Sequence, residues 1–552
     1  MKAAELFVKC LENEGVEYIF GVPGEENVEV MLALENSPIR FILCRHEQGA
    51  AFMADVYGRL TGRPGVCLGT LGPGATNLVT GVADANMDRS PLVVLTGQAD
   101  STRQHKESHQ SMDVVAMFRP LTKWAQPILH TRNIPEVVRK AFKIAVQEKP
   151  GACHIELAND IASYETQNEP VPVHRVRRPV PDDQVVDRAL DLFGKARKPI
   201  ILAGNGAVRT SASKQLRRFV EKTKIGVVST FMGKGAVSRH SEQCLFTIGL
   251  QAKDLTWEAL DDADLVITLG YDLVEYPPMI WNKCYCHKND RKIVHIDFLP
   301  AEVDDHYRVD VEIVGDLAHT LWMLNQKMAG ESVSFDLKYQ GEIRHRLLLD
   351  FMEAKDDKTR GLIRPQKVLW DVREVMGPED ILLSDVGAHK MWIARYYHCD
   401  EPNTCLISNG FCSMGFALPG AVGAKIVYPG RKILAICGDG GFLMNLQELE
   451  TARRMGGNIV IMVWEDNEYG LIKWKQQNQF GRHTDLRFNN PDFVKLAESF
   501  DCVGMRVENS VDLKPALEKA FEIDRPVVLA VPIDYRENLK LSDRLGTIQC
   551  NL

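Results

Sequence analysis

Short apolar runs alternate with longer segments of helical periodicity along the whole chain. The first 165 residues contain such runs at 18–20, 40–44, 65–69, 92–95 and 153–157. They recur at 199–203, 225–228, 264–269 and 292–297, and again at 381–385, 432–437, 458–464 and 527–531. Apolar strands separated by helical patterns are typical of parallel sheets with crossover helices. The pattern predicts an α/β fold of three successive doubly wound parallel sheets.

Two polar stretches divide this pattern into three blocks. Residues 165–179 are poor in apolar side chains and rich in prolines and charges, as expected of an exposed connector. Residues 353–360 form a second polar stretch, before the third block. A chain of 552 residues has the length of roughly three ordinary domains. We therefore expect domains at 1–165, 183–330 and 360–540.

Composition and charge narrow the functional classes. Hydrophobic residues make up 45% and charged residues 25% of the chain, and the net charge is only −8. This mild charge, without a basic cluster, argues against a nucleic-acid or anionic-membrane partner. No apolar run approaches 18 residues, so no membrane-spanning helix is expected. The N-terminus carries Lys2, Glu5 and Lys9 and is not typical of a signal peptide.

The cysteines indicate a reduced, cytoplasmic protein. The chain has 13 of them, scattered, and Cys44, Cys67 and Cys437 stand inside strand-like runs. The sequence Cys284-Tyr-Cys286-His287 has half of a metal-site pattern. Because no second pair stands at zinc spacing, a surface turn is the favoured interpretation there.

The strongest chemical signal lies in the third block. Gly438, Asp439, Gly440 and Gly441 follow one strand-like run, and Asp466 ends the next, 27 positions after Asp439. Mg²⁺ is usually bound through one or two carboxylates together with phosphate oxygens. Glycines let backbone N–H groups approach a phosphate, and the N-terminus of the following helix favours an anion. The spacing predicts a site for a divalent cation and a diphosphate; the alternative is an ordinary glycine turn.

Two other features are ambiguous when taken alone. Gly204-Asn205-Gly206 follows a strand-like run, as a dinucleotide-binding loop does. The glycine fingerprint is incomplete, however, and no acidic residue ends the next strand at the expected distance, so a structural domain is favoured. Glu47 opens a helix of otherwise small and apolar residues, which by itself is compatible with a surface position at a helix N-terminus.

Taken together, the motifs resemble the thiamine-diphosphate enzymes of the acetolactate synthase type. The resemblance runs from about residue 5 to 540 in the family's order, so the three blocks would be the pyrimidine-binding, central and diphosphate-binding domains. The implied cofactors are thiamine diphosphate and Mg²⁺. The stretches that carry the resemblance are 20–24, 45–54, 72–77, 109–113, 408–410, 413–415 and 438–440.

The resemblance is closest to the FAD-independent, catabolic branch of that family. Residues 270–276, 281–282 and 531–535 are similar to that branch. The FAD-containing branch usually carries an Arg-Phe-Asp-Asp-Arg-like stretch where this chain has residues 271–275, so FAD is not expected. Residues 232–235 are less typical of the catabolic enzymes.

The resemblance also implies roles for individual residues. Glu47 would hydrogen-bond the cofactor's aminopyrimidine ring, Met414 would be the apolar wedge that keeps the cofactor bent, and Gln110 would orient the substrate. The Cys412 carbonyl and the Met414 N–H would bind the pyrimidine edge. Asp439, Asp466 and the backbone carbonyl of Glu468 would be the Mg²⁺ ligands. The remaining cofactor-binding positions are Gly24, Gly387, Ala388, His389, Gly438, Gly440 and Gly441.

The implied reaction is decarboxylation of pyruvate and transfer of the two-carbon unit to a second 2-keto acid, which gives 2-acetolactate. A simple 2-keto acid decarboxylase would share every cofactor residue and stays an alternative, as does a related thiamine-diphosphate carboligase. Lys475 stands where biosynthetic synthases place an acceptor-selecting Trp, and Trp474 precedes it. A non-catalytic relative is disfavoured because Glu47, Asp439 and Asp466 are all present. The resemblance implies a homodimer at least, and a homotetramer, with the pyrimidine and diphosphate domains of different subunits sharing a site.

Overall fold

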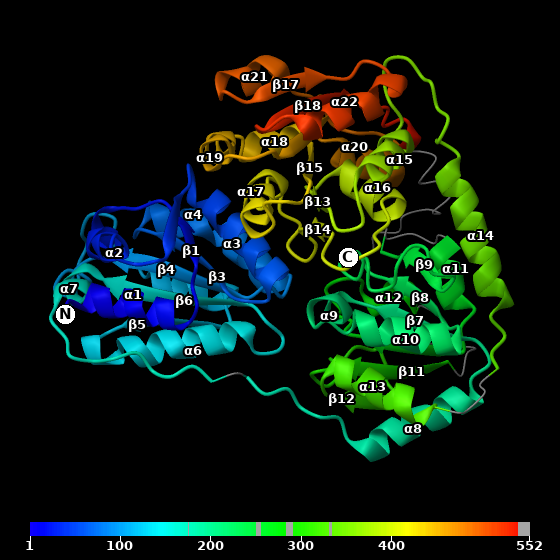
Figure 1. Cartoon of the computed structure of the whole chain (residues 1–552), viewed down its shortest axis with the longest axis horizontal. Coiled ribbons are helices and arrows are strands. Elements are labelled where there is room, and N and C mark those ends of the chain that lie inside the picture. The colour runs from blue at the N-terminus through cyan, green and yellow to red at the C-terminus, as the bar shows by residue number, and fades with distance from the viewer. Residues whose placement is uncertain (175, 250–254, 283–290, 330–333, 539–552) are drawn as a thin grey trace.

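The computed structural model describes residues 1–174, 176–249, 255–282, 291–329 and 334–538. They form three α/β units, each built around a six-stranded sheet (Figure 1). Every strand pair in these sheets is parallel. The predicted fold class is confirmed.

The first and third units share one topology. The first sheet has the order β2-β1-β3-β4-β6-β5 and the third has β14-β13-β15-β16-β18-β17, which is the same order counted from the first strand of each. The first unit comprises β1 (Tyr18–Gly21), β2 (Arg40–Leu43), β3 (Gly65–Gly69), β4 (Leu92–Gln98), β5 (Trp124–Ile128), β6 (Ala152–Ala158), α1 (Ala3–Asn13), α2 (Val28–Leu34), α3 (Glu47–Thr61), α4 (Pro73–Met87), α5 (Val114–Phe118), α6 (Ile134–Val146), α7 (Asn159–Ser163) and the 3-10 turns Glu25–Asn27, Arg119–Leu121 and Thr131–Asn133.

The third unit repeats this strand order. It comprises β13 (Ile381–Ser384), β14 (Cys405–Ile407), β15 (Ile433–Gly438), β16 (Val460–Glu465), β17 (Val503–Arg506), β18 (Val527–Pro532), α15 (Pro365–Val375), α16 (Ala388–Tyr396), α17 (Ala417–Val427), α18 (Asp439–Met444), α19 (Glu448–Met455), α20 (Gly470–Phe480), α21 (Phe493–Ser499) and α22 (Ser510–Glu522).

The middle unit has a different strand order, β12-β11-β10-β7-β8-β9. The chain therefore runs outward from the centre of this sheet in both directions. Its elements are β7 (Pro199–Ala203), β8 (Gly226–Ser229), β9 (Cys244–Thr247), β10 (Leu265–Leu269), β11 (Lys292–Asp297), β12 (Val311–Val314), α8 (Asp183–Lys195), α9 (Asn205–Arg209), α10 (Ser213–Thr223), α11 (Leu255–Asp261), α12 (Pro278–Trp281), α13 (Leu317–Lys327) and α14 (Lys338–Met352).

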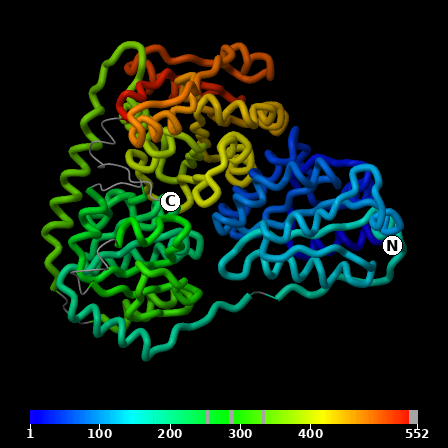
Figure 2. Tube along the Cα trace, turned by 180° about the vertical axis from the view of Figure 1, so that it is seen from behind, coloured from blue at the N-terminus to red at the C-terminus, as the bar shows by residue number. Residues whose placement is uncertain are grey.

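Two connectors run along the outside of the molecule. Residues 167–181, as far as they are described, contain no helix or strand, and they cross from the first to the middle unit as an extended trace (Figure 2). Helix α14 leads from the middle unit toward the third (Figure 1). Residues 353–360 follow α14 and precede α15, as their polar composition predicted.

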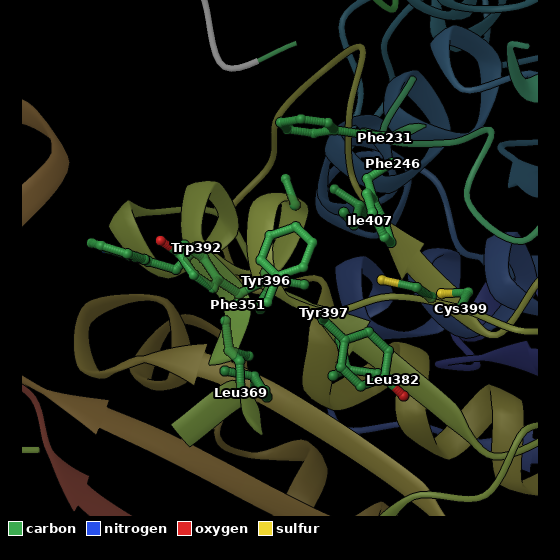
Figure 3. Close-up of a cluster of buried hydrophobic side chains, with 14 of the residues drawn as sticks. Phe231, Phe246, Phe351, Leu369, Leu382, Trp392, Tyr396, Tyr397, Cys399 and Ile407 are labelled. Atoms are coloured by element: carbon green, nitrogen blue, oxygen red, sulfur yellow. The ribbon is translucent and has the colours of Figure 1, made fainter. Parts of the chain in front are cut away.

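The third unit shares an apolar core with each of the others. Helices α3 and α17 pack closely because small residues face the contact: a Cβ on Gly423 would lie 2.7 Å from the Met53 carbonyl oxygen. A second shared core joins the third unit to the middle unit, where Phe231 and Phe246 lie among side chains from the α16 region (Figure 3). The labelled third-unit residues in that view are Leu369, Leu382, Trp392, Tyr396, Tyr397, Cys399 and Ile407.

Polar contacts join the first unit to the middle unit. Asp272 forms ion pairs with Arg89 at 2.9 Å and Lys149 at 3.2 Å. Arg209 pairs with Glu148 at 2.5 Å. The first and middle units are therefore held together by directional interactions between specific side chains.

Lys234 attaches the middle unit to the end of α16. Its Nζ donates to the carbonyl oxygens of Ala394, at 2.8 Å, and Tyr397, at 2.7 Å, and the residue is buried. Replacing Lys234 by methionine would leave both carbonyls without this donor, at a cost of about 1–3 kcal/mol. We expect a lower unfolding midpoint in differential scanning calorimetry. Lys338→Met, whose side chain is 85% exposed, is the control; equal midpoints for the two variants would contradict this role.

Within the described parts of the chain, no helix is both long and apolar enough to cross a membrane. The cysteines in the same parts are free thiols, and most are buried. The Cys284, Cys286 and His287 pattern lies outside the described residues.

Candidate active site

Asp439 and Asp466 lie at the carboxyl ends of two neighbouring strands. Strands β15 and β16 pair in register through Gly438 and Trp464, so the residues that follow them are adjacent. One carboxylate oxygen of Asp439, Oδ2, accepts from the backbone N–H of Asp466 at 3.0 Å and of Asn467 at 2.7 Å. Its other oxygen, Oδ1, accepts from the N–H of Gly440 at 2.8 Å. The structure thus brings the two predicted carboxylates together.

The electrostatics of this pair fit a divalent cation. Burial, then the nearby Asp439 carboxylate, raises the pKa of Asp466 to about 8. A dication between the two carboxylates would relieve their repulsion and favour the ionised form. Among the described residues, no group of three His, Cys, Asp or Glu side chains could hold a metal. Two carboxylates with backbone and phosphate oxygens are instead the donor set that Mg²⁺ accepts.

Two buried polar atoms without a protein partner lie next to this pair. Asn490 donates from Nδ2 to Asp439 Oδ2 at 2.7 Å, while its own Oδ1 accepts nothing in the protein. His389 Nε2 is also buried without a partner. Buried polar atoms are normally satisfied, so such atoms call for an explanation. A bound metal–diphosphate group provides one, and the residues present fit that group.

His389 belongs to the start of α16, together with Gly387 and Ala388. A Cβ on Gly387 would lie 2.8 Å from the His389 ring, and one on Gly438 would lie 3.2 Å from it. Burial lowers the pKa of His389 to about 3, so the imidazole is neutral. The ring thus packs over two of the predicted glycines, where larger residues would displace it.

Gly440 and Gly441 are constrained from other sides. A Cβ on Gly440 would lie 3.0 Å from the Tyr469 ring, and one on Gly441 would lie 3.0 Å from the Asp385 carboxylate. The backbone carbonyl of Glu468, two residues after Asp466, accepts from the N–H of Gly470 at 2.9 Å. The predicted residues of the third unit therefore form one group around the ends of β13, β15 and β16.

The predicted residues of the first unit form a second group, around the loop between β3 and α4. A Cβ on Gly24 would lie 2.4 Å from the Thr70 side chain, and one on Gly74 would lie 3.4 Å from Glu47 Oε1. A Cβ on Gly72 would lie 2.9 Å from the Gln110 carbonyl oxygen. Gly24, Glu47 and Gln110 thus all lie close to residues 70–74.

Glu47 is the first residue of α3, and only 8% of it is exposed. Its Oε2 accepts from Asn77 Nδ2 at 2.9 Å. The turn before it is fixed by Glu448, whose Oε1 accepts from the backbone N–H of Arg45 at 3.2 Å and of His46 at 3.0 Å. A buried carboxyl at a helix start, held on one side, is suited to hydrogen-bonding a ligand ring.

Comparison with known proteins matches three family models in chain order. They are the thiamine pyrophosphate enzyme N-terminal TPP binding domain at residues 1–117, the central domain at 186–324 and the C-terminal TPP binding domain at 385–531. The acetolactate synthase of Bacillus subtilis (strain 168) is 36% identical over 552 residues, which cover 99% of this chain and 95% of the relative. The catabolic acetolactate synthase of Raoultella terrigena is 37% identical, with 99% and 97% covered.

A probable acetolactate synthase large subunit from Methanococcus aeolicus is 34% identical over 98% of this chain and 93% of its own length. Full-length identity of this order, together with the three domain models, decides the family. The chain belongs to the acetolactate synthase family of thiamine-diphosphate enzymes. The resemblance that the sequence motifs indicated is confirmed.

In this member of the acetolactate synthase family, Met414 lies on a loop held by residues that the sequence did not suggest. The neighbouring Gly415 donates its N–H to both carboxylate oxygens of Asp385, at 2.9 and 3.1 Å. The Gly415 carbonyl accepts from Asn445 Nδ2 at 2.8 Å. Burial raises the pKa of Asp385 to about 6, and the N–H donors oppose that rise. Met414 itself is half-buried, and Cys412 is exposed with a φ of +55°.

Gln110 and Trp474 occupy different environments. Gln110 is exposed and has a φ of +57°, so its side chain is accessible beside the 70–74 loop. Trp474, on α20, is only 5% exposed and packs in the core shared by the middle and third units. Lys475, the next residue, is exposed. Trp474 is thus a core residue in this chain, whereas Lys475 is accessible from outside.

Proposed function

We propose that this chain decarboxylates pyruvate and joins the two-carbon unit to a second 2-keto acid, producing 2-acetolactate. The observation that carries the proposal is the coexistence of the buried Glu47 carboxyl with the Asp439–Asp466 pair. The full-length relatives named acetolactate synthases support the same reaction. Thiamine diphosphate, when bound, supplies the electron sink that decarboxylation requires.

The chain's own residues would bind and orient the reactants. Asp439, Asp466 and the Glu468 carbonyl would hold Mg²⁺, and the glycine turns around His389 would receive the diphosphate. Glu47 would hydrogen-bond the pyrimidine ring and control its proton, Met414 would support the cofactor through apolar contact, and Gln110 would orient the 2-keto acid. These roles assign pyrimidine binding to residues 1–165, the central domain to 183–330 and diphosphate binding to 360–540.

We further propose that two subunits complete each site. Within the described residues of one chain, the hydrogen bond of Glu47 runs to Asn77, and none joins Glu47 to Asp439, Asp466 or Glu468. A homodimer in which Glu47 serves a partner's metal–diphosphate group is the minimum unit, and a homotetramer is the expected assembly. The abundance of free, mostly buried cysteines supports a reducing, cytoplasmic location.

The deciding experiment is product analysis after incubation with thiamine diphosphate, Mg²⁺ and pyruvate. Because acid converts acetolactate to acetoin, we expect acetoin that appears only after acidification. Acetaldehyde without acetoin would instead identify a 2-keto acid decarboxylase on the same cofactor frame. A visible spectrum of the purified protein tests the flavin expectation, since a flavin band would move the chain to the FAD-containing branch.

A further inference from the structure

The middle unit has the strand order of a dinucleotide-binding domain. Strands β7 and β10 lie side by side at the centre, and the chain runs outward from them in both directions. In open α/β sheets, ligands bind at such a reversal point, beyond the carboxyl ends of the strands. The 204–206 turn leaves β7 at this position and leads into α9. It therefore stands where a dinucleotide loop would meet a phosphate.

In this chain, residues of the same unit occupy the 204–206 turn. The Asn205 N–H donates to both oxygens of Glu275, at 3.0 and 3.1 Å, and the Thr230 hydroxyl also hydrogen-bonds Glu275. A Cβ on Gly204 would lie 2.5 Å from the Gly270 carbonyl oxygen, and one on Gly206 would lie 2.5 Å from the Gly270 Cα. The 270–276 segment thus packs directly on both glycines, and Glu275 uses the N–H that a phosphate would need.

Glu275 suits this enclosed position as a neutral group. Burial raises its pKa to about 8, with the Thr230 and Asn205 hydrogen bonds opposing the rise. At pH 7 most molecules therefore carry the proton on one oxygen, while the carboxyl still accepts from the Asn205 N–H and the Thr230 hydroxyl. Glutamine offers the same acceptor and donor, so Glu275→Gln is a conservative variant and Glu275→Ala is a disruptive one.

The closed turn is connected to the loop that carries Cys412 and Met414. Asn205 Nδ2 donates to the backbone carbonyl of Asp88 at 3.1 Å. The buried Asp88 carboxylate accepts from the N–H of Asn409 at 2.8 Å and of Gly410 at 2.6 Å. Direct packing adds to this route, since a Cβ on Gly410 would lie 3.2 Å from Val274 of the 270–276 segment.

Further hydrogen bonds hold Asp88 and the 408–414 loop in place. Arg59 donates to Asp88 Oδ2 at 3.0 Å and to the Ile407 carbonyl at 2.8 Å, one residue before the loop. The Ser408 hydroxyl donates to Asp84 and accepts from the N–H of Ser413 at 2.8 Å. A displacement of Asp88 would therefore reach the 408–414 loop without being absorbed by a flexible element.

We propose that Glu275 is a positioning residue for the cofactor: it closes the 204–206 turn and, through Asn205 and Asp88, holds the 408–414 loop in the shape that receives the pyrimidine end of thiamine diphosphate. The middle unit thus contributes to cofactor binding without touching the cofactor. This inference rests on the proposed binding role of Cys412 and Met414, but it is independent of which product the enzyme forms.

The test measures the affinity of the full-length protein for Mg²⁺–thiamine diphosphate by quenching of tryptophan fluorescence, without pyruvate. We expect Glu275→Ala to weaken binding by about tenfold and Glu275→Gln by no more than about threefold. Glu221→Ala, on the exposed face of α10, should bind as the unchanged protein does. A folded Glu275→Ala variant with unchanged affinity would overturn the proposal, as would equal losses for the alanine and glutamine variants.

Asn205→Ala keeps the test decisive if Glu275→Ala does not fold. It removes the amide that reaches Asp88 and leaves the backbone N–H on Glu275, in a half-buried residue. We expect affinity to fall by about three- to tenfold, and unchanged affinity would refute the route. If the unchanged protein released acetaldehyde without acetoin while the variants showed these affinity losses, the proposed function would be overturned and this inference would stand.

A second titration tests the closure of the turn. FAD and ADP, added separately to the unchanged protein, should give no saturable binding because Glu275 and the 270–276 segment occupy the turn. Saturable binding of either one that weakens in Asn205→Ala would show an open turn and contradict the proposal.

Discussion

Glu47→Gln is expected to lower kcat by about 10²–10⁴-fold, the usual cost of losing a positioned acid–base group. Glutamine preserves the length of the side chain, but it cannot carry and exchange the proton of a carboxyl. Glu47 is the first residue of α3, is 8% exposed and accepts from Asn77, so its position depends on fixed partners. Steady-state kinetics at saturating Mg²⁺, thiamine diphosphate and pyruvate would measure the loss.

Glu35→Gln, an exposed position after α2 in the same unit, is the matched control and should retain full turnover. Far-UV circular dichroism of both variants would show whether the fold is intact. Full turnover by a folded Glu47→Gln variant would refute the role assigned to this carboxyl. If, instead, only the apparent affinity for cofactor changed, Glu47 would be a binding residue rather than a proton-handling one.

The strands that the sequence did not predict are β5, β9, β12, β14 and β17. Each of them lies at the edge of its sheet. Central strands such as β4 and β7 are buried along their whole length; β7 reads as a continuous apolar run, and β4 begins with one at residues 92–95. An edge strand contacts the core on fewer sides: β17 has no fully buried residue, and β5 includes Pro127. Its position comes from pairing with a neighbour, which local composition does not reveal.

The candidate site also contains residues that the sequence predicted and supporting residues that it did not. Asp439 and Asp466 could be paired from the sequence because each ends a recognisable strand, and parallel strands bring their ends to one edge. The groups that hold these residues were not predictable. Asn490 reaches Asp439 from 51 positions away, and Glu448 reaches the turn before Glu47 from 402 and 403 positions away. Such contacts depend on how whole units pack, and neither partner stands in a motif.

In the middle unit, the structure explains why the glycine pattern at residues 204–206 is not that of a dinucleotide-binding loop. The incomplete glycine fingerprint favoured a structural domain over a dinucleotide site, and the packing of residues 270–276 on Gly204 and Gly206 explains that incompleteness physically. Glycines at these two positions permit contact with the chain's own backbone rather than with a phosphate. A glycine pattern therefore predicts close approach, while the identity of the approaching group has to come from the structure.

Asp439→Asn should weaken the binding of Mg²⁺ and thiamine diphosphate by at least about 10²-fold, with little effect on folding. The amide removes one of two anionic ligands of the proposed metal, and its NH₂ group cannot accept. Asp439 takes three N–H donors on Oδ2 and one on Oδ1, so one of these donors would face another donor. Titration calorimetry with each cofactor, in the presence of the other, would measure the change.

The control is Asp485→Asn, a carboxylate of the same unit whose side chain is 67% exposed and pairs with Arg487. It should bind both cofactors normally. Burial, and after it the charge of Asp439, raises the pKa of Asp466 to about 8, so removing that charge should lower this pKa in the apo variant. Cofactor affinity equal to that of the control would exclude Asp439 as a metal ligand. Asp466 and one backbone carbonyl are too few ligands to keep normal cofactor affinity on their own. Unchanged affinity would therefore mean that the metal binds elsewhere and that the Asp439–Asp466 pair is a structural feature of the β15–β16 edge.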